Sequence, residues 1–142
     1  MKKKYLIVIA DYYKDISKGL LTSALSLIPK SNIIKIITVP GVFEIPVTIS
    51  KNIKKYDAFL ALGCVIKGQT PHFDFISQAS TNAIMDISVN NKKPVGNGII
   101  TCLNMKQAEA RKKKGAEAAT AVMSILAQKW EPISIQKIIQ EL

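Results

Sequence analysis

The sequence has few cysteines, few aromatic residues and no long apolar run. Its two cysteines, Cys64 and Cys102, each lie within an apolar stretch, which suits buried reduced thiols better than the disulfide framework of a small secreted protein. No apolar block reaches the length needed to cross a bilayer. The stretch from Tyr5 to Ala10, behind the basic start, is also too short for a signal-peptide core. These absences predict a cytoplasmic protein with no membrane partner.

Acidic residues are also scarce. The chain carries 10 Asp and Glu against 20 Lys and Arg, which gives a formal net charge of +10. A basic excess attracts nucleic acids and small anions alike. The lysines are scattered, however, and the densest cluster, at 111–114, has none of the interleaved aromatic residues typical of nucleic-acid binding. We therefore expect no nucleic-acid partner and a basic field that favours anionic small molecules.

Strand-like and helix-like segments alternate along the 142 residues. The spacing of apolar residues, with Pro and Gly as breaks, predicts strands at 5–10, 33–39, 58–66 and 95–103, and helices at 16–28, 44–53, 74–89, 105–113 and 116–128. This alternation implies right-handed crossovers and a parallel sheet covered on both faces. We expect one α/β domain over residues 1–142, a three-layer α/β/α sandwich on a four-stranded parallel sheet.

The unusual residues follow the predicted strands. In parallel α/β sheets the ligand lies beyond the carboxyl ends of the strands, and those ends are followed here by segments 11–13, 39–44, 67–74 and 104–111. The segment Gly68-Gln69-Thr70 precedes a helix, so its backbone N–H groups could hold a phosphate. It could equally be an ordinary strand-to-helix turn, because it matches neither a Walker motif nor a GxGxxG fingerprint.

His72 is the only histidine and lies in the same polar loop. A single histidine is more often structural than catalytic, yet at a ligand edge it is the natural proton carrier near neutral pH. No second histidine or paired cysteine joins it, so we expect no metal site. Cys64 lies inside a strand, where a nucleophilic role is not expected.

Other polar and aromatic candidates each have two interpretations. Glu44 is either a first-turn acid favoured by the helix dipole or an acceptor for ligand hydroxyls. Tyr12 and Phe43 are either core residues or rings that stack on a planar heterocycle. Arg111 and Lys114 are either solvated helix charges or clamps for a phosphate. Residue types alone leave these alternatives open.

Four motifs, in order along the chain, resemble the lumazine synthase family. They read VPGVFEIP at 39–46, LGCVIKGQTPHFD at 62–74, PVGNGIIT at 94–101, and QA at 107–108 with Arg111 and then KGAEAA at 114–119. The match extends from the first strand to the last predicted helix. The resemblance implies a flavodoxin-like fold and a single lumazine synthase domain over residues 1–142.

The same resemblance implies a transferase of riboflavin biosynthesis. It would condense 5-amino-6-(D-ribitylamino)uracil with 3,4-dihydroxy-2-butanone 4-phosphate, releasing 6,7-dimethyl-8-ribityllumazine, phosphate and water, with no metal or organic cofactor. It assigns proton transfer to His72, with Glu117 as a partner, and phosphate binding to the 68–70 loop. The implied substrate contacts are Tyr12, Val42, Phe43, Glu44, Cys64, Val65, Ile66, Gln69, Thr70, Asn97, Arg111 and Lys114.

The family's site is shared between subunits, with Arg111 and Lys114 coming from the neighbour. The resemblance therefore implies a homopentamer, and it leaves open a sixty-subunit capsid and a partnership with riboflavin synthase. Two positions depart from the family pattern. Tyr13 stands where a small polar residue is expected, and Asn97 stands where many members place an aromatic residue.

Other functions remain as alternatives at the level of sequence. An archaeal-type riboflavin synthase would use two lumazines, but its substrate has no phosphate for the 68–72 loop to hold. A flavodoxin-like module could hold a flavin or lumazine without catalysis. A purely structural shell protein is a third alternative.

Overall fold

The computed structural model describes residues 2–142 and contains one four-stranded sheet. Its strands are all parallel and lie in the order β2-β1-β3-β4, which is the flavodoxin-like arrangement. The strand bounds are β1 Lys4–Ala10, β2 Ile33–Val39, β3 Ala58–Ile66 and β4 Val95–Cys102. The central strands β1 and β3 are almost continuously apolar, as strands buried on both faces are.

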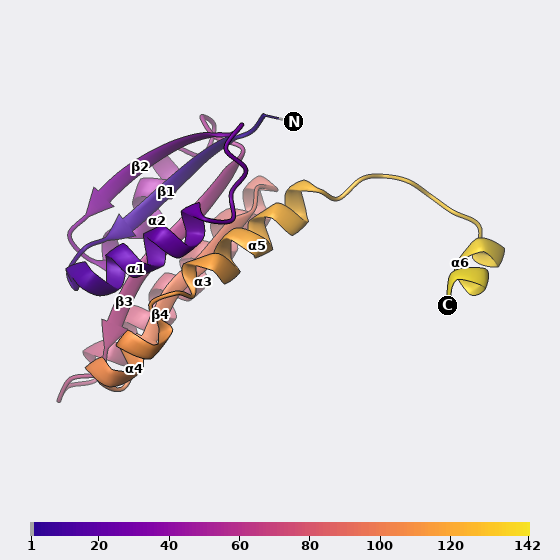
Figure 1. Ribbon diagram of the computed structural model, residues 1–142. Coiled ribbons are helices and arrows are strands. Elements are labelled where there is room, and N and C mark those ends of the chain that lie inside the picture. The colour runs from indigo at the N-terminus through magenta and orange to yellow at the C-terminus, as the bar shows by residue number, and fades with distance from the viewer. Residues whose placement is uncertain (1) are drawn as a thin grey trace.

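Helices cover both faces of this sheet, which confirms the three-layer prediction. On one face, α1 (Lys14–Leu25) and α5 (Gly115–Leu126) lie side by side, with α4 (Met105–Arg111) leading into α5 (Figure 1). The other face carries the short 3-10 helix η1 (Val42–Glu44), α2 (Ile45–Lys51) and α3 (His72–Asn91).

The alternation of side chains along β1 fills two separate cores. Successive residues of a strand point to opposite faces of the sheet. Ile7 and Ile9 therefore pack with α1 and α5, whereas Leu6 and Val8 pack with α2 and α3. Strand β1 thus ties both layers of helices to the middle of the sheet.

Several predicted boundaries were wrong at the helices. The helix expected at 16–28 occupies Lys14–Leu25, the one expected at 44–53 divides into η1 and α2, and the one expected at 74–89 is longer at both ends. Gly115, expected between two helices, is the first residue of α5. By contrast, the bounds of β2 and β3 are confirmed to the residue.

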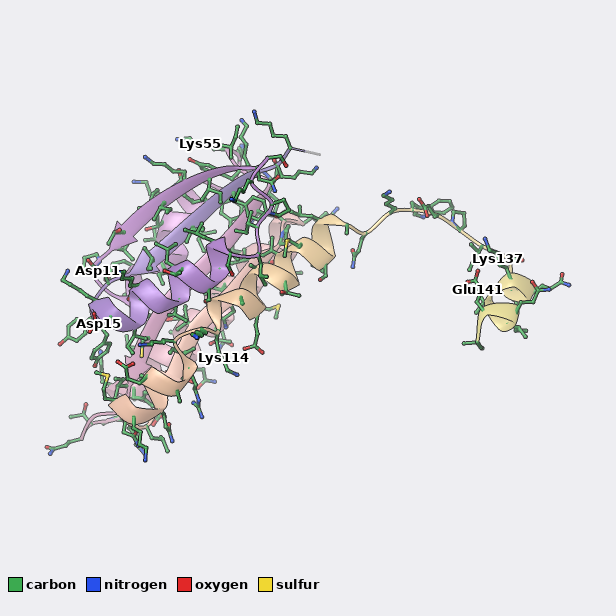
Figure 2. All side chains as sticks on the ribbon, in the orientation of Figure 1. Asp11, Asp15, Lys55, Lys114, Lys137 and Glu141 are labelled. Carbon is green, nitrogen blue, oxygen red and sulfur yellow. The ribbon has the colours of Figure 1, made fainter. Side chains whose placement is uncertain are left out.

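The helix expected at 116–128 was predicted to be the last one, and this prediction was wrong. A further helix, α6 (Ile135–Glu141), stands apart from the sheet and its covering helices at the end of an extended segment (Figure 1). None of its residues is buried, and Figure 2 shows Lys137 and Glu141 there, far from the other labelled side chains. Within residues 2–142, no helix is both long and apolar enough to span a membrane.

Candidate functional site

An open cavity of ≈ 610 Å³ lies beyond the carboxyl ends of β1, β2 and β3. Figure 2 shows Asp11 at this end of the sheet and Lys55 at the opposite end. The cavity is lined by Tyr12, Tyr13, Gly41, Val42, Phe43, Glu44, Cys64, Val65, Ile66, His72 and Ile76. The prediction that the site follows the strand ends therefore matches the position of this cavity.

The parallel strands bring segments distant in sequence to the cavity. Ala10 at the end of β1 pairs with Val39 at the end of β2, and β3 runs beyond its pairing with β1 to Ile66. The residues that follow each strand consequently meet at one edge of the sheet. The buried hydroxyl of Ser17 donates to the carbonyl of Ala10 at 2.6 Å, which holds the end of β1 against α1.

Two tyrosines form one wall of the cavity. The rings of Tyr12 and Tyr13 contact each other edge to face, with centroids 4.9 Å apart and planes 78° apart. Tyr12 is 75% exposed, so its ring lies at the mouth of the cavity. Tyr13 packs against the core under α1 and α5.

Phe43 and Glu44 belong to η1, the turn that follows β2. The backbone N–H of Glu44 donates to the carbonyl of Gly41 at 3.2 Å, and the carbonyl of Glu44 accepts the Thr48 hydroxyl at 2.8 Å. These bonds fix the turn while the Glu44 carboxylate and the 62% exposed Phe43 ring remain at the cavity. Glu44 is the N-cap residue of α2, not a residue of its first turn.

His72 is the first residue of α3, and it also lines the cavity. Ile76 lies one helical turn later, where residues four apart share a face, and it also lines the cavity while packing against the core. The imidazole is exposed, so solvent and a bound ligand can both reach it.

The loop before His72 offers unused hydrogen-bond donors. Among residues 2–142, no protein hydrogen bond takes the backbone N–H of Gly68, Gln69 or Thr70, and all three residues are exposed. The loop leads directly into the N-terminus of α3, a helix of 20 residues. Free N–H groups at a helix N-terminus are suited to bind an anion.

Cys64 forms part of the apolar floor of the cavity. Burial, followed by the proximity of Cys102, raises the pKa of the Cys64 thiol to about 12. A thiol with so high a pKa is protonated near neutral pH and is a poor nucleophile. The structure thus agrees with the expectation that Cys64 is not a nucleophile.

Five of the expected site residues do not line this cavity. Gln69 and Thr70 lie in the exposed loop beside it, and Asn97 is exposed on the edge strand β4, where its side chain accepts from the backbone of Ile99 at 3.0 Å. Arg111 donates to the carbonyl of Thr101 at 3.3 Å. The remaining one, Lys114, is described next.

The two expected anion clamps are held on the α1 and α5 side of the sheet. Arg111 is the last residue of α4, and the Lys114 ammonium pairs with Glu117 of α5 at 3.3 Å. Glu117 therefore contacts Lys114 and is not among the residues that line the cavity with His72. Within residues 2–142, no lysine or arginine lines the cavity.

Three lining residues were not proposed from the sequence as ligand contacts: Tyr13, Gly41 and Ile76. Ile76 could have been found from its position four residues after His72. Tyr13 was noted only as a departure from the family pattern, because alternation along β1 gives no information on a side chain beyond the strand end.

Fold and cavity together define a flavodoxin-like α/β protein with a cavity of small-molecule size at the carboxyl edge of its sheet. The sequence profile of 6,7-dimethyl-8-ribityllumazine synthase matches residues 2–129. The enzyme of that name from Bartonella bacilliformis is 44% identical over 134 residues, 87% of this chain and 88% of the relative. Those of Bartonella henselae and Bartonella tribocorum are 44% and 42% identical over 90% and 91% of this chain, and over 89% and 93% of their own.

The chain therefore belongs to the 6,7-dimethyl-8-ribityllumazine synthase family, a family of transferases in riboflavin biosynthesis. The matched region ends at residue 129. It includes every residue that lines the cavity and excludes residues 130–142, which contain α6 and most of the extended segment before it.

Proposed function

We propose that this protein condenses 5-amino-6-(D-ribitylamino)uracil with 3,4-dihydroxy-2-butanone 4-phosphate. The products are 6,7-dimethyl-8-ribityllumazine, phosphate and water. The observation that carries the proposal is the placement of His72 between an aromatic-walled cavity and a loop whose backbone donors take part in no protein hydrogen bond within residues 2–142. The cavity suits a planar heterocycle with a polar chain, and the loop suits a phosphate.

Each wall of the cavity has a role in this reaction. The exposed ring of Tyr12 stacks on the pyrimidine, and the carboxylate of Glu44 accepts hydrogen bonds from the ribityl hydroxyls beside Phe43. Val42, Cys64, Val65 and Ile66 form the apolar floor that orients the ring.

His72 moves protons between the reacting groups. The 5-amino group of the pyrimidine attacks the ketone carbon of the butanone phosphate, and one water leaves as the imine forms. Phosphate leaves in a later elimination that generates a new carbonyl on the four-carbon chain. The ribityl-substituted amine then attacks this carbonyl, and the ring closes with loss of a second water. An imidazole near neutral pH can accept a proton in one step and return it in the next. Much of the rate enhancement comes from holding both substrates in register, which can supply roughly 7 kcal/mol or more of the barrier. We propose that no metal or organic cofactor takes part.

The phosphate is bound at the loop before α3. The N–H groups of Gly68, Gln69 and Thr70 and the helix dipole provide partial positive charge there. Full positive charge must come from elsewhere, because the chain's own Arg111 and Lys114 are absent from the cavity wall. We propose that both cations, together with Asn97, approach the cavity of an adjacent copy.

A homopentamer supplies such a neighbour. Its contact surface includes the outer side of α2 and α3, where Val47 and Phe75 are 58% and 67% exposed. Residues 75–85 of α3 contain no charged side chain in a chain with 21% charged residues, as expected for a surface that another subunit covers. A sixty-subunit capsid, or a complex with riboflavin synthase, is compatible with this pentamer. We further propose that the protein is located in the cytoplasm.

The free donors of the 68–70 loop favour this reaction over that of an archaeal-type riboflavin synthase. That alternative uses two lumazines as substrates, neither of which carries a phosphate. A module that only holds a flavin would leave His72 without a role, even if a flavin phosphate occupied the loop.

Lumazine formation from the two substrates, followed by absorbance after subtraction of the uncatalysed reaction, tests the proposal. Replacement of a charged hydrogen-bond partner costs about 1.5–3 kcal/mol, so Arg111→Ala should raise the KM for the butanone phosphate roughly 10- to 100-fold. Loss of the proton carrier in His72→Ala should lower kcat by roughly tenfold or more. Lys106→Ala, which removes an exposed cation from the same helix as Arg111, is the matched control and should change neither constant.

The absence of product above background from a correctly folded oligomer would overturn the catalytic proposal. Equal effects of Arg111→Ala and Lys106→Ala would show that only the general basic field matters.

A further inference from the structure

We propose that Tyr13 is a positioning residue of this site: its ring fixes the orientation of the Tyr12 ring, which stacks on the heterocycle at the mouth of the cavity. The inference rests on the proposed function for the identity of the ligand. It concerns a residue that the sequence analysis noted only as an unexpected tyrosine.

Tyr12 cannot hold its own orientation. Its side chain is 75% exposed, and no hydrogen bond within residues 2–142 uses its hydroxyl. A side chain in that position would exchange between staggered rotamers in solution. Each rotamer presents a different ring plane to the cavity, and only one of them is suited to stacking on a given ligand pose.

Both the backbone and the side chain of Tyr13 are held in place. Its carbonyl accepts the N–H of Ser17 at 2.9 Å as the N-cap residue of α1, which fixes its backbone. Its side chain is half-buried and packs against the core under α1 and α5. A ring anchored in this way can serve as a fixed wall for a more mobile neighbour.

The contact between the two rings has a favourable geometry. The centroid separation of 4.9 Å and the interplanar angle of 78° describe an edge-to-face pair, the arrangement that the aromatic quadrupole prefers. Burial, then Tyr12 and then Cys64 raise the pKa of the Tyr13 hydroxyl.

A double-mutant cycle tests whether Tyr13 acts through Tyr12. The variants are Tyr12→Leu, Tyr13→Leu and the double replacement, with Tyr13→Phe as the matched control that keeps the ring. The lumazine product is titrated into each assembled variant to measure its Kd, and the KM of each substrate is measured beside it. Thermal unfolding of every variant reports any purely structural contribution.

Tyr13→Leu should weaken lumazine binding by roughly three- to tenfold, the range expected for one aromatic pair. It should raise the KM of the pyrimidine by a similar factor and leave the KM of the butanone phosphate unchanged. Tyr13→Phe should bind as the wild type does. In the Tyr12→Leu background, Tyr13→Leu should have no further effect on binding, because there is no ring left to orient.

Additive effects of the two leucine replacements would overturn the inference, and so would equal weakening by Tyr13→Phe and Tyr13→Leu. A lower unfolding temperature with unchanged binding constants would reduce Tyr13 to a core residue. The two proposals can fail separately. Binding without product formation refutes the catalytic proposal while the cycle still tests Tyr13, whereas a wild type that neither binds lumazine nor forms it overturns both.

Discussion

The two faces of the sheet differ in how completely the chain covers them. Under α1 and α5 the packing leaves no room for a side chain at two glycines of β4. An added Cβ on Gly96 would meet the carbonyl oxygen of Ala118, and one on Gly98 would meet the Leu62 side chain. On the other face, α2 and α3 leave Val47, Phe75 and further large apolar side chains exposed. On this second face, residues 75–85 of α3 contain no charged side chain, so exposed apolar side chains lie there without neighbouring charges on that part of the helix.

This difference bears on the site, because the cavity opens between the two regions. Phe43 lines the cavity and also a smaller hollow on the α2 and α3 side, together with Pro46, Val47, Ala79, Ser80 and Ala83. A subunit that covers the exposed face would therefore come close to the cavity as well. Stability and assembly should consequently respond to changes on different faces.

The largest effect should come from Gly115 on the closed face. A Cβ at this position would overlap the backbone carbonyl of Leu20 in α1, and backbone atoms cannot move aside cheaply. Gly115→Ala should lower the free energy of unfolding by about 3 kcal/mol, at the upper end of overpacking costs. Urea or thermal unfolding measures the change.

Gly68→Ala is the matched control, because nothing lies within 4 Å of a Cβ there. It should change the free energy of unfolding by less than about 0.5 kcal/mol, as surface substitutions usually do. Similar losses from both replacements would contradict the close packing of α1 against α5.

The second effect concerns assembly and not folding. Val47 is 58% exposed on α2, and Ile125 is 47% exposed on α5, so a glutamate is tolerated at either position in an isolated subunit. If copies associate through the α2 and α3 face, Val47→Glu buries an unpaired charge at the contact, which costs several kcal/mol. It should dissociate the oligomer, whereas Ile125→Glu should leave it intact.

Sedimentation velocity or native mass spectrometry distinguishes these outcomes. If only Ile125→Glu dissociates the oligomer, or if the oligomer survives both replacements, the contact between subunits lies on another surface. Far-UV circular dichroism of both variants checks that the subunits themselves remain folded.

The smallest effect should be the pH dependence that Cys64 contributes. The folded-state pKa of this thiol is raised from its ordinary value of 9.0 to about 12, chiefly by burial. Between these values the unfolded chain loses a proton that the folded protein retains, so stability falls as pH rises from 9 towards 12. Below pH 9 both states hold the proton and this contribution is fully present.

Comparison of urea unfolding at pH 7 and pH 10 in the wild type and in Cys64→Ala isolates this contribution. The wild type should lose slightly more stability between the two pH values, because all other titrating groups are shared. An equal loss in both proteins would mean that Cys64 is less buried than its 6% exposure indicates.

Helix starts were predictable where a capping side chain marks them. Asn104 accepts the backbone N–H of Gln107 at 2.9 Å, and the predicted start of α4 at Met105 is confirmed. The starts of α1 and α3 were placed two residues too late, because Tyr13 and Pro71 at their N-caps make no side-chain capping bond.

The helix α6 carried a signal that was missed. Ser134 accepts the N–H of Lys137 at 3.2 Å, and apolar residues follow at helical spacing. The position of the candidate site could likewise be predicted only in part. The segments after the strands were correctly placed at one edge, but the separation of Arg111 and Lys114 from the cavity depends on which face of the sheet each helix covers.

The sequence by itself determined the elements and their order, because apolar periodicity and the dihedral limits of Pro and Gly act over a few residues. It also determined which segments follow the strand ends, and therefore which residues were candidates for the site. Only the tertiary structure decided that the Tyr13 ring contacts the Tyr12 ring edge to face, that Ile76 lines the same cavity as His72, and that large apolar side chains of α2 and α3 remain exposed. Those relations arise from strand pairing and helix packing between segments far apart in the chain. The spacing of residues within one segment gives no information on them.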